Sequence, residues 1–304
     1  GIDAKENSFI GATPWERIAT AFFAYSAGLL AKSAGVLGFA DDASKYAELR
    51  DNVARAFREE YVTPSGRLAS PTQTAYAVAL MFDLLEEGTR QQAADRLAKL
   101  IEEAGSQLTT GFVGTPYLCH VLTRFGHADL AYKLLERREY PSWLYPVVKG
   151  ATTIWEHWDG IKPDGSFWSD DMNSYNHYAY GAIGDWLFGS VAGIDTEASE
   201  PGYKRVRVRP VPGGSLKFAE ASLESPYGEI RSAWRRRPDG GIDYEIVVPA
   251  NAAANVLLPG ASKANATESQ QPLDAAEGIS NVAETAEGLA LGLGSGKYRF
   301  TVKN

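Results

Sequence analysis

The sequence predicts a two-domain protein in which a helical domain precedes a small antiparallel β domain. The chain has 304 residues, more than one hydrophobic core usually holds, and 44% of them are hydrophobic. Apolar residues recur at three- and four-residue steps through the first two thirds of the chain. Short β-branched runs separated by Gly and Pro turns follow. The change in pattern predicts domains of residues 1–200 and 201–304.

The first helical hairpin is predicted between Thr13 and Tyr61. Thr13 and Pro14 form a helix start signal, with Thr13 as the N-cap and Pro14 at the first helical position. A second helix is expected over about residues 42–61, with an apolar inner face and charges on the other side. The face of the first helix that is expected to be buried carries Ile18, Phe22, Tyr25, Leu29 and Leu30.

Two more helical pairs follow, at residues 72–85 with 90–103 and at residues 116–125 with 128–136. In each pair an almost entirely apolar helix precedes one with a charged face, as expected for an inner helix ringed by an outer one. Helix is expected again over residues 173–191. The pattern predicts a ring of helical hairpins.

The β domain is predicted from separate strand-like runs. They lie at about residues 206–211, 230–233, 242–248, 256–258 and 298–302. Residues 261–293 have weak periodicity and are expected to form loops and irregular strands.

Composition excludes several function classes. The net charge of −8 disfavours nucleic acid as a partner. The single Cys119 rules out an intrachain disulfide and a thiolate zinc site, and its apolar neighbours indicate a buried core thiol. No metal or other cofactor is predicted. No continuous apolar run approaches the ~20 residues of a membrane span, and no signal peptide opens the chain, so a cytoplasmic protein without a membrane partner is expected.

The densest candidate chemistry is an aromatic passage that contains Glu156. Trp155 and Trp158 flank this carboxylate. Indole faces pack against the C–H faces of a sugar ring while a carboxylate handles a proton or a hydroxyl, so the pattern favours a sugar site. His177 is expected to orient a hydroxyl or water, or to tune Glu156, from the first turn of the helix at residue 173. A satisfied core histidine is the alternative.

The other candidates in this passage have structural interpretations as well. Trp143 and Tyr145 could line a pocket or belong to the core. His157 and His120 are assigned to structure. Four aspartates are candidates for a second carboxylate beside Glu156, and for them turn and helix-cap roles are the favoured interpretation. They are Asp159, Asp164, Asp170 and Asp171.

Four motifs in order resemble the bacterial α-L-rhamnosidases of glycoside hydrolase family 78. The resemblance runs through most of residues 13–260. The motifs are Thr109-Thr110-Gly111-Phe112-Val113-Gly114-Thr115-Pro116-Tyr117-Leu118, Tyr140-Pro141-Ser142-Trp143-Leu144-Tyr145-Pro146, Gly150-Ala151-Thr152-Thr153-Ile154-Trp155-Glu156 and Asn173-Ser174-Tyr175-Asn176-His177-Tyr178-Ala179-Tyr180-Gly181.

The resemblance implies an (α/α)6 barrel followed by a small C-terminal β-sandwich, and removal of terminal α-L-rhamnose from rhamnosides with inversion. It places Glu156 at the general base that activates water, and His177 at the pocket histidine beside the sugar. The residues expected to bind the sugar are Trp143, Tyr145, Trp155, Trp158 and Asn176.

The family's general acid motif, an Asp-Glu-Arg sequence near the start of the barrel, has no match here. About eight of the twelve barrel helices are predicted, and the chain opens with Gly1 instead of Met. The expectation is therefore an incomplete barrel, a rhamnosidase fragment whose acid lies in a preceding N-terminal part. The alternatives are a noncatalytic carbohydrate-binding or assembly protein on the same fold, and an (α/α)6 glycosidase or phosphorylase for another sugar.

Overall fold

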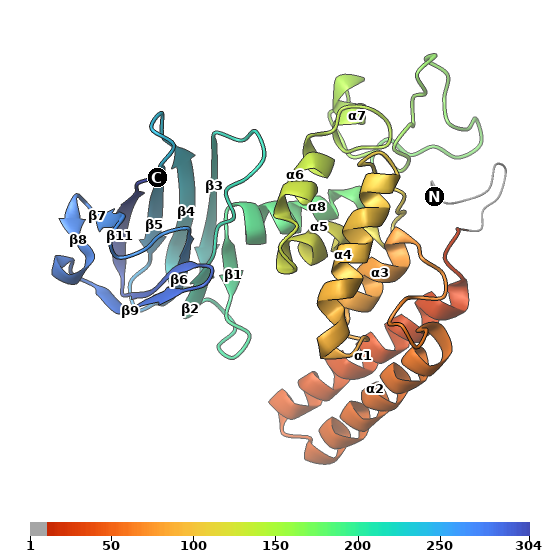
Figure 1. The fold of residues 1–304 in the computed structure, drawn as a ribbon, viewed down its shortest axis with the longest axis horizontal. Helices are drawn as coiled ribbons and strands as arrows, with labels where there is room; N and C mark the ends of the chain where they lie inside the picture. The colour runs from red at the N-terminus through yellow and green to blue at the C-terminus, as the bar shows by residue number, and fades with distance from the viewer. Residues whose placement is uncertain (1–10) are drawn as a thin grey trace. The chain divides into compact units, whose positions relative to one another are not determined.

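A helical unit followed by a β unit makes up residues 11–304, which the computed structural model describes (Figure 1). The first compact unit ends at Ile183 and the second comprises Gly184–Asn304. Residues 1–10, which the sequence assigns to the helical domain, lie outside the described part. The domain boundary near residue 200 stays a prediction. The predicted fold class, helical hairpins and then a β-sandwich, is confirmed.

The first hairpin consists of α1 (Trp15–Leu37) and α2 (Ala40–Tyr61). Gly38 joins them in the left-handed conformation, with φ of 82°, which glycine adopts without a steric penalty. Its N–H donates to the Gly35 carbonyl, and Phe39 donates to the Ala34 carbonyl. These bonds satisfy the last carbonyls of α1 and reverse the chain within two residues.

The predicted N-cap of α1 is wrong. The helix begins at Trp15 after an extended Pro14, and no side chain caps it. The Thr13 hydroxyl instead shares a 2.6 Å hydrogen bond with the hydroxyl of Thr72, 59 residues away. The Thr13 hydroxyl therefore bonds to Thr72, a residue distant in sequence, and does not cap the N-terminus of α1 as the local spacing predicted.

The predicted buried face of α1 is only partly correct, because Ile18 and Phe22 are half-buried and the rings of Phe22 and Tyr25 pack on Phe82. The buried residues of α1 are Arg17 and four alanines, while Leu29 and Leu30 remain 46% and 45% exposed. Small side chains let the backbones of α1 and α2 approach closely, which makes the alanine face the packing face. The buried alanines are Ala21, Ala24, Ala27 and Ala34.

α1 is the one helix among the described residues that is long and apolar enough to cross a membrane by length and composition. The sequence analysis looked for a continuous apolar run of ~20 residues and did not identify α1 by that criterion. A core helix passes the same test. α1 packs against α2, but only 22% of its most apolar stretch is buried, so this pairing leaves much of its apolar surface exposed.

The inner and outer helices that the sequence predicts are present as α3 (Gln73–Met81) with α4 (Glu87–Glu103) and α5 (Thr115–Arg124) with α6 (Ala128–Glu136). All residues of α3 from Gln73 to Leu80 are buried, whereas α4 buries one apolar stripe and exposes charges. Thr72 caps α3, accepting from the N–H of Ala75 at 3.1 Å. A short α7 (Leu144–Val148) follows.

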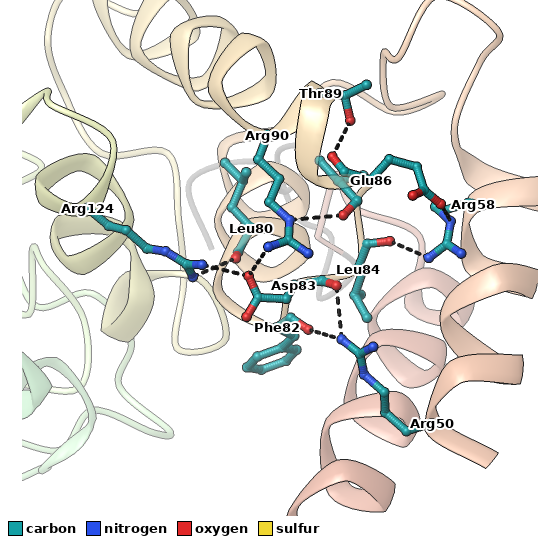
Figure 2. A network of polar contacts seen from close by, with 11 residues as sticks. Arg50, Arg58, Leu80, Phe82, Asp83, Leu84, Glu86, Thr89, Arg90 and Arg124 are labelled. Carbon is teal, nitrogen blue, oxygen red and sulfur yellow. Dashed lines mark hydrogen bonds and ion pairs between the residues drawn. The ribbon is translucent and has the colours of Figure 1, made fainter. Parts of the chain in front are cut away.

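Asp83, which follows α3, joins three helices (Figure 2). Its Oδ1 lies 3.1 Å from Arg90 of α4 and 2.8 Å from Arg124 of α5. Arg50 of α2 donates to the Asp83 carbonyl at 3.0 Å, and Arg58 donates to the Leu84 carbonyl at 3.1 Å. Cations at a helix C-terminus offset its negative end, so this cluster links α2, α4 and α5 to the end of α3.

The helix predicted to start at residue 173 starts later. A 3-10 turn over Ala179–Ala182 leads into α8 (Ile183–Trp186) and a π-helical turn over Leu187–Val191. Residues 173–178 instead lie beside residues 154–156 through hydrogen bonds. Tertiary backbone pairing replaces the helical bonds that the periodicity implied.

The second unit contains two sheets that face each other as a β-sandwich (Figure 1). All strand pairs are antiparallel except β2 with β6. One sheet has the order β1 (Ile194–Thr196), β2 (Arg205–Val208), β6 (Ala253–Pro259), β10 (Gly288–Leu293), β9 (Ile279–Thr285). The other has the order β3 (Phe218–Ser225), β4 (Gly228–Arg236), β5 (Ile242–Val248), β11 (Gly296–Val302), β7 (Ala266–Glu268), β8 (Gln271–Pro272).

Residues 261–293 are more regular than predicted, since they hold β7 to β10 and a 3-10 turn over Leu273–Ala275. Ala and Gly have low strand propensity, so sequence alone gave a weak signal. Pairing of β10 with β6, which places Leu289 opposite Leu258, stabilises these strands. The core of this unit includes Trp234, whose Nε1 donates to the Val191 carbonyl at 2.7 Å.

Candidate functional site

Glu156 lies on a segment that pairs with the segment of His177. The Glu156 N–H donates to the Ser174 carbonyl at 2.9 Å, and the His177 N–H donates to the Ile154 carbonyl at 2.8 Å. The Thr153 hydroxyl donates to the Tyr175 carbonyl. These bonds bring two candidates 21 residues apart onto adjacent stretches of backbone.

The Glu156 carboxylate is held at one oxygen. The N–H of Ser174 donates to Oε2 at 3.1 Å, and the side chain is 17% exposed. The carboxylate is thus fixed in orientation while part of it stays accessible to solvent, as a group that takes a proton from water requires.

His177 is held in one tautomer. Its Nδ1 accepts from the N–H of Ala179 at 3.3 Å, so the neutral ring carries its proton on Nε2. The ring stacks on Phe112 with centroids 4.9 Å apart and on Tyr178 at 5.7 Å. The imidazole is therefore positioned to donate one hydrogen bond from Nε2.

His177 contributes to a hollow of about 750 Å³ on the helical unit. Glu156 is not among its lining residues, although Ile154 of the same segment is. The hollow is mainly apolar, which suits the carbon face of a sugar or its aglycone. Its lining residues are Phe112, Pro116, Ile154, His177, Tyr178, Ala179, Gly181 and Ala182.

The predicted aromatic residues form a buried layer, because Trp143, Tyr145 and Trp158 are each at most 8% exposed. Trp158 stacks on Tyr180 with centroids 3.6 Å apart and meets Trp143 edge to face. Trp143 Nε1 donates to the Tyr180 carbonyl at 3.0 Å, and the Tyr145 hydroxyl donates to the Ile161 carbonyl at 2.9 Å. This layer supports the Glu156 segment from within.

Trp155 and Asn176 lie on the two paired segments themselves. Trp155 is buried and meets Tyr175 edge to face, whereas Asn176 is exposed. Contact of Asn176 or of the tryptophans with a sugar stays a prediction.

His157, which the sequence assigns to structure, lies beside the candidate base. Its Nε2 is 3.9 Å from Glu156 Oε1, and its ring stacks on Trp168 with centroids 3.6 Å apart. Burial lowers the pKa of His157 and raises the pKa of Asp159. Burial and the charge of Asp159 together raise the pKa values of Tyr140 and Tyr145.

The other predicted acidic residues have local roles. Asp164 accepts from the N–H and the hydroxyl of Ser166 at 2.9 and 2.7 Å, which confirms the turn interpretation. Asp170 and Asp171 do not cap a helix, because none starts near residue 173. The described residues contain no group of three His, Cys, Asp or Glu that could hold a metal ion.

Sequence reasoning missed Phe112 and Tyr178 as lining residues and His157 as a neighbour of Glu156. Phe112 and Tyr178 stand inside motifs that it quoted, but the ring contact of Phe112 with His177 joins segments 65 residues apart, and adjacency in sequence does not show that the Tyr178 ring stacks on His177. His157 directly follows Glu156, and adjacency alone does not show that the two side chains meet.

Comparisons with known proteins agree with this architecture. A family model for the bacterial α-L-rhamnosidase six-hairpin glycosidase domain matches residues 3–191, and a model for the bacterial α-L-rhamnosidase C-terminal domain matches residues 193–272. An α-L-rhamnosidase of Streptomyces avermitilis is 42% identical over 290 residues, which are 95% of this chain. One of Formosa agariphila is 43% identical over 251 residues, 82% of this chain.

Solved structures give the same result. The crystal structure of the Streptomyces avermitilis α-L-rhamnosidase complexed with L-rhamnose matches 96% of this chain with a TM-score of 0.88 and 42% identity. An α-L-rhamnosidase from Aspergillus terreus matches 96% with a TM-score of 0.84 and 32% identity. The chain spans 27% of each curated relative and 27% and 31% of these two solved chains. The chain belongs to the bacterial α-L-rhamnosidase family.

Proposed function

We propose that this chain carries the general base of an inverting α-L-rhamnosidase that releases terminal α-L-rhamnose from rhamnosides. The observation that carries the proposal is the pairing that places Glu156, with its carboxylate held by the Ser174 N–H, next to the segment of His177. In this role Glu156 takes a proton from a water molecule as the water attacks the anomeric carbon, and His177 donates from Nε2 to a sugar hydroxyl.

Inversion needs a second group on the other face of the sugar. A general acid must protonate the leaving oxygen, and its carboxyl group lies roughly 6.5–9.5 Å from the base to leave room for the water. We place this acid in the part of the relatives' length that the chain does not span. In this proposal, the partner of this chain is the N-terminal part of the same protein, which would carry the acid.

The predicted binding residues have two roles in this proposal. Asn176 is exposed beside His177 and offers an amide to a sugar hydroxyl. The buried layer of Trp143, Tyr145 and Trp158, together with Trp155, supports the shape of the site. The apolar rings of Phe112 and Tyr178 give the hollow a surface for the methyl group of the 6-deoxy sugar or for the aglycone.

The test replaces the matching segment of the Streptomyces avermitilis enzyme with this chain. The chimera should hydrolyse an aryl α-L-rhamnoside with inversion, and Glu156→Gln should lower kcat by roughly several hundredfold or more. Glu224→Gln, on strand β3, is the matched control and should leave kcat unchanged.

An unchanged rate in the Glu156→Gln chimera would remove Glu156 from the mechanism. Calorimetry with L-rhamnose on the chain alone separates the alternatives: binding by the chain with an inactive chimera would favour a noncatalytic carbohydrate-binding protein. A rate that depends on phosphate would favour a phosphorylase.

A further inference from the structure

The imidazole of His157 faces the candidate base without bonding to it. Nε2 and Glu156 Oε1 are 3.9 Å apart, too far for a hydrogen bond and close enough for an ion pair. Both side chains are largely buried, at 24% and 17% exposed. Because an unprotonated ring nitrogen and a carboxylate are both acceptors, this gap is what a neutral His157 with its proton on Nδ1 would leave.

Nothing else in the described residues bonds to this nitrogen. His157 Nε2 is buried and has no hydrogen-bond partner. A buried polar atom without a hydrogen-bond partner is unfavourable. The ring is held there by its stack on Trp168, with planes only 10° apart. A small movement toward Oε1 would give the nitrogen a partner, provided that it carried a proton.

The charges around His157 make that protonation responsive to pH. Among the described residues, the titratable groups that act on it are Glu156, Asp159 and His177. Burial is the largest influence and lowers its pKa, the two carboxylates oppose this, and His177 adds to it. The lowered pKa means that His157 gains its proton in more acidic solution than an ordinary histidine does.

We propose that His157 is a positioning residue that withdraws Glu156 from catalysis in acid. A proton from solvent binds Nε2, the N–H bond points at Oε1, and the resulting ion pair occupies the oxygen that would otherwise accept a proton from water. Loss of the proton breaks the pair and frees the carboxylate. This inference rests on the proposed function of Glu156.

The first test measures the coupling on the chain itself, without activity. The chain has four histidines, so their ring C–H signals can be followed by NMR against pH and assigned by single substitutions. Glu156→Gln removes the attracting charge and should lower the pKa of His157 by about 0.5–1 unit, while the pKa of His127 stays constant. An unchanged His157 pKa would overturn the proposal.

The second test measures catalysis in the chimera. His157→Phe keeps a ring for the stack on Trp168 and removes the proton site. The acid limb of kcat/KM should move about 1 unit or more to lower pH, with the rate near pH 7 retained within about threefold. His127→Phe, whose histidine pairs with Asp95 on another helix pair, should keep the original profile.

An acid limb that His157→Phe leaves in place would refute the role of His157. If this variant does not fold, as judged by circular dichroism, His157→Gln serves instead, with the same expected shift and the same refuting outcome. Full activity of Glu156→Gln would instead refute the proposed function, and the NMR coupling would still show whether the two groups interact.

Discussion

Asp83 is a single carboxylate that receives two arginines from different helices (Figure 2). We expect Asp83→Asn to lower the free energy of unfolding of the helical unit. Asparagine keeps nearly the same shape and tolerates the positive φ of 53° at this position, so the substitution removes mainly the charge. The pairs with Arg90 and Arg124 are partly exposed, with 23%, 43% and 38% of the arginine and aspartate side chains accessible.

The expected magnitude follows from that exposure. Each partly exposed ion pair contributes about 0.2–1 kcal/mol, so the loss of both costs about 0.5–2 kcal/mol. For a unit of this size, 1 kcal/mol lowers Tm by about 2–4 °C, which predicts a decrease of about 1–8 °C. In about 0.5 M NaCl the difference should shrink, because salt screens charges at partly exposed sites.

The assay is thermal unfolding followed by circular dichroism at 222 nm, at low and high salt. Asp51→Asn is the matched control, because Asp51 is 71% exposed and pairs only with its neighbour Arg50 among the contacts described. It should change Tm by less than about 1 °C. Equal Tm values for Asp83→Asn and the wild type, or a difference that salt does not reduce, would refute this reasoning.

Three further substitutions or reactions test other parts of the chain. Thr72→Ala should destabilise the helical unit by about 0.5–2 kcal/mol in urea unfolding, because it removes the cap of α3, and an unchanged midpoint would count against that cap. Gly193→Ala should prevent folding of the β unit or lower its free energy of unfolding by more than about 3 kcal/mol. The reason is that the φ of Gly193 is 87° and a Cβ there would lie 2.2 Å from the Pro210 nitrogen. Soluble protein with the wild-type Tm would contradict this. Burial raises the pKa of Cys119 to about 12. At pH 8 the thiol should therefore react with a disulfide reagent about a thousandfold more slowly in the folded protein than in urea. Fast labelling of the folded protein would show that the thiol is accessible.

Several elements could be predicted from the sequence because local patterns and tertiary packing agree there. The apolar helix α3 and the amphipathic helix α4 have patterns that match their inner and outer positions. The β-branched runs at β4 and β5 likewise became paired strands. Where the two influences conflicted, packing prevailed: four alanines of α1 are buried, while Leu29 and Leu30 of its predicted inner face are exposed.

The site shows the same division. The residue types around Glu156 indicated sugar chemistry, and the order of four motifs indicated the family. Residue order alone could not show that residues 154–156 pair with residues 174–177, because those backbone bonds replace a helix that the periodicity favoured. Nor could it show that His157 turns toward Glu156 while stacked on Trp168.

By itself, the sequence determined the α-then-β order, the hairpin repeat and the chemical types of the candidate groups, because these depend on composition and short-range periodicity. Only the tertiary structure decided which faces are buried, which rings stack on His177 and which groups surround each carboxylate. Those properties depend on contacts between residues far apart in the chain, and short-range patterns carry no information about such contacts.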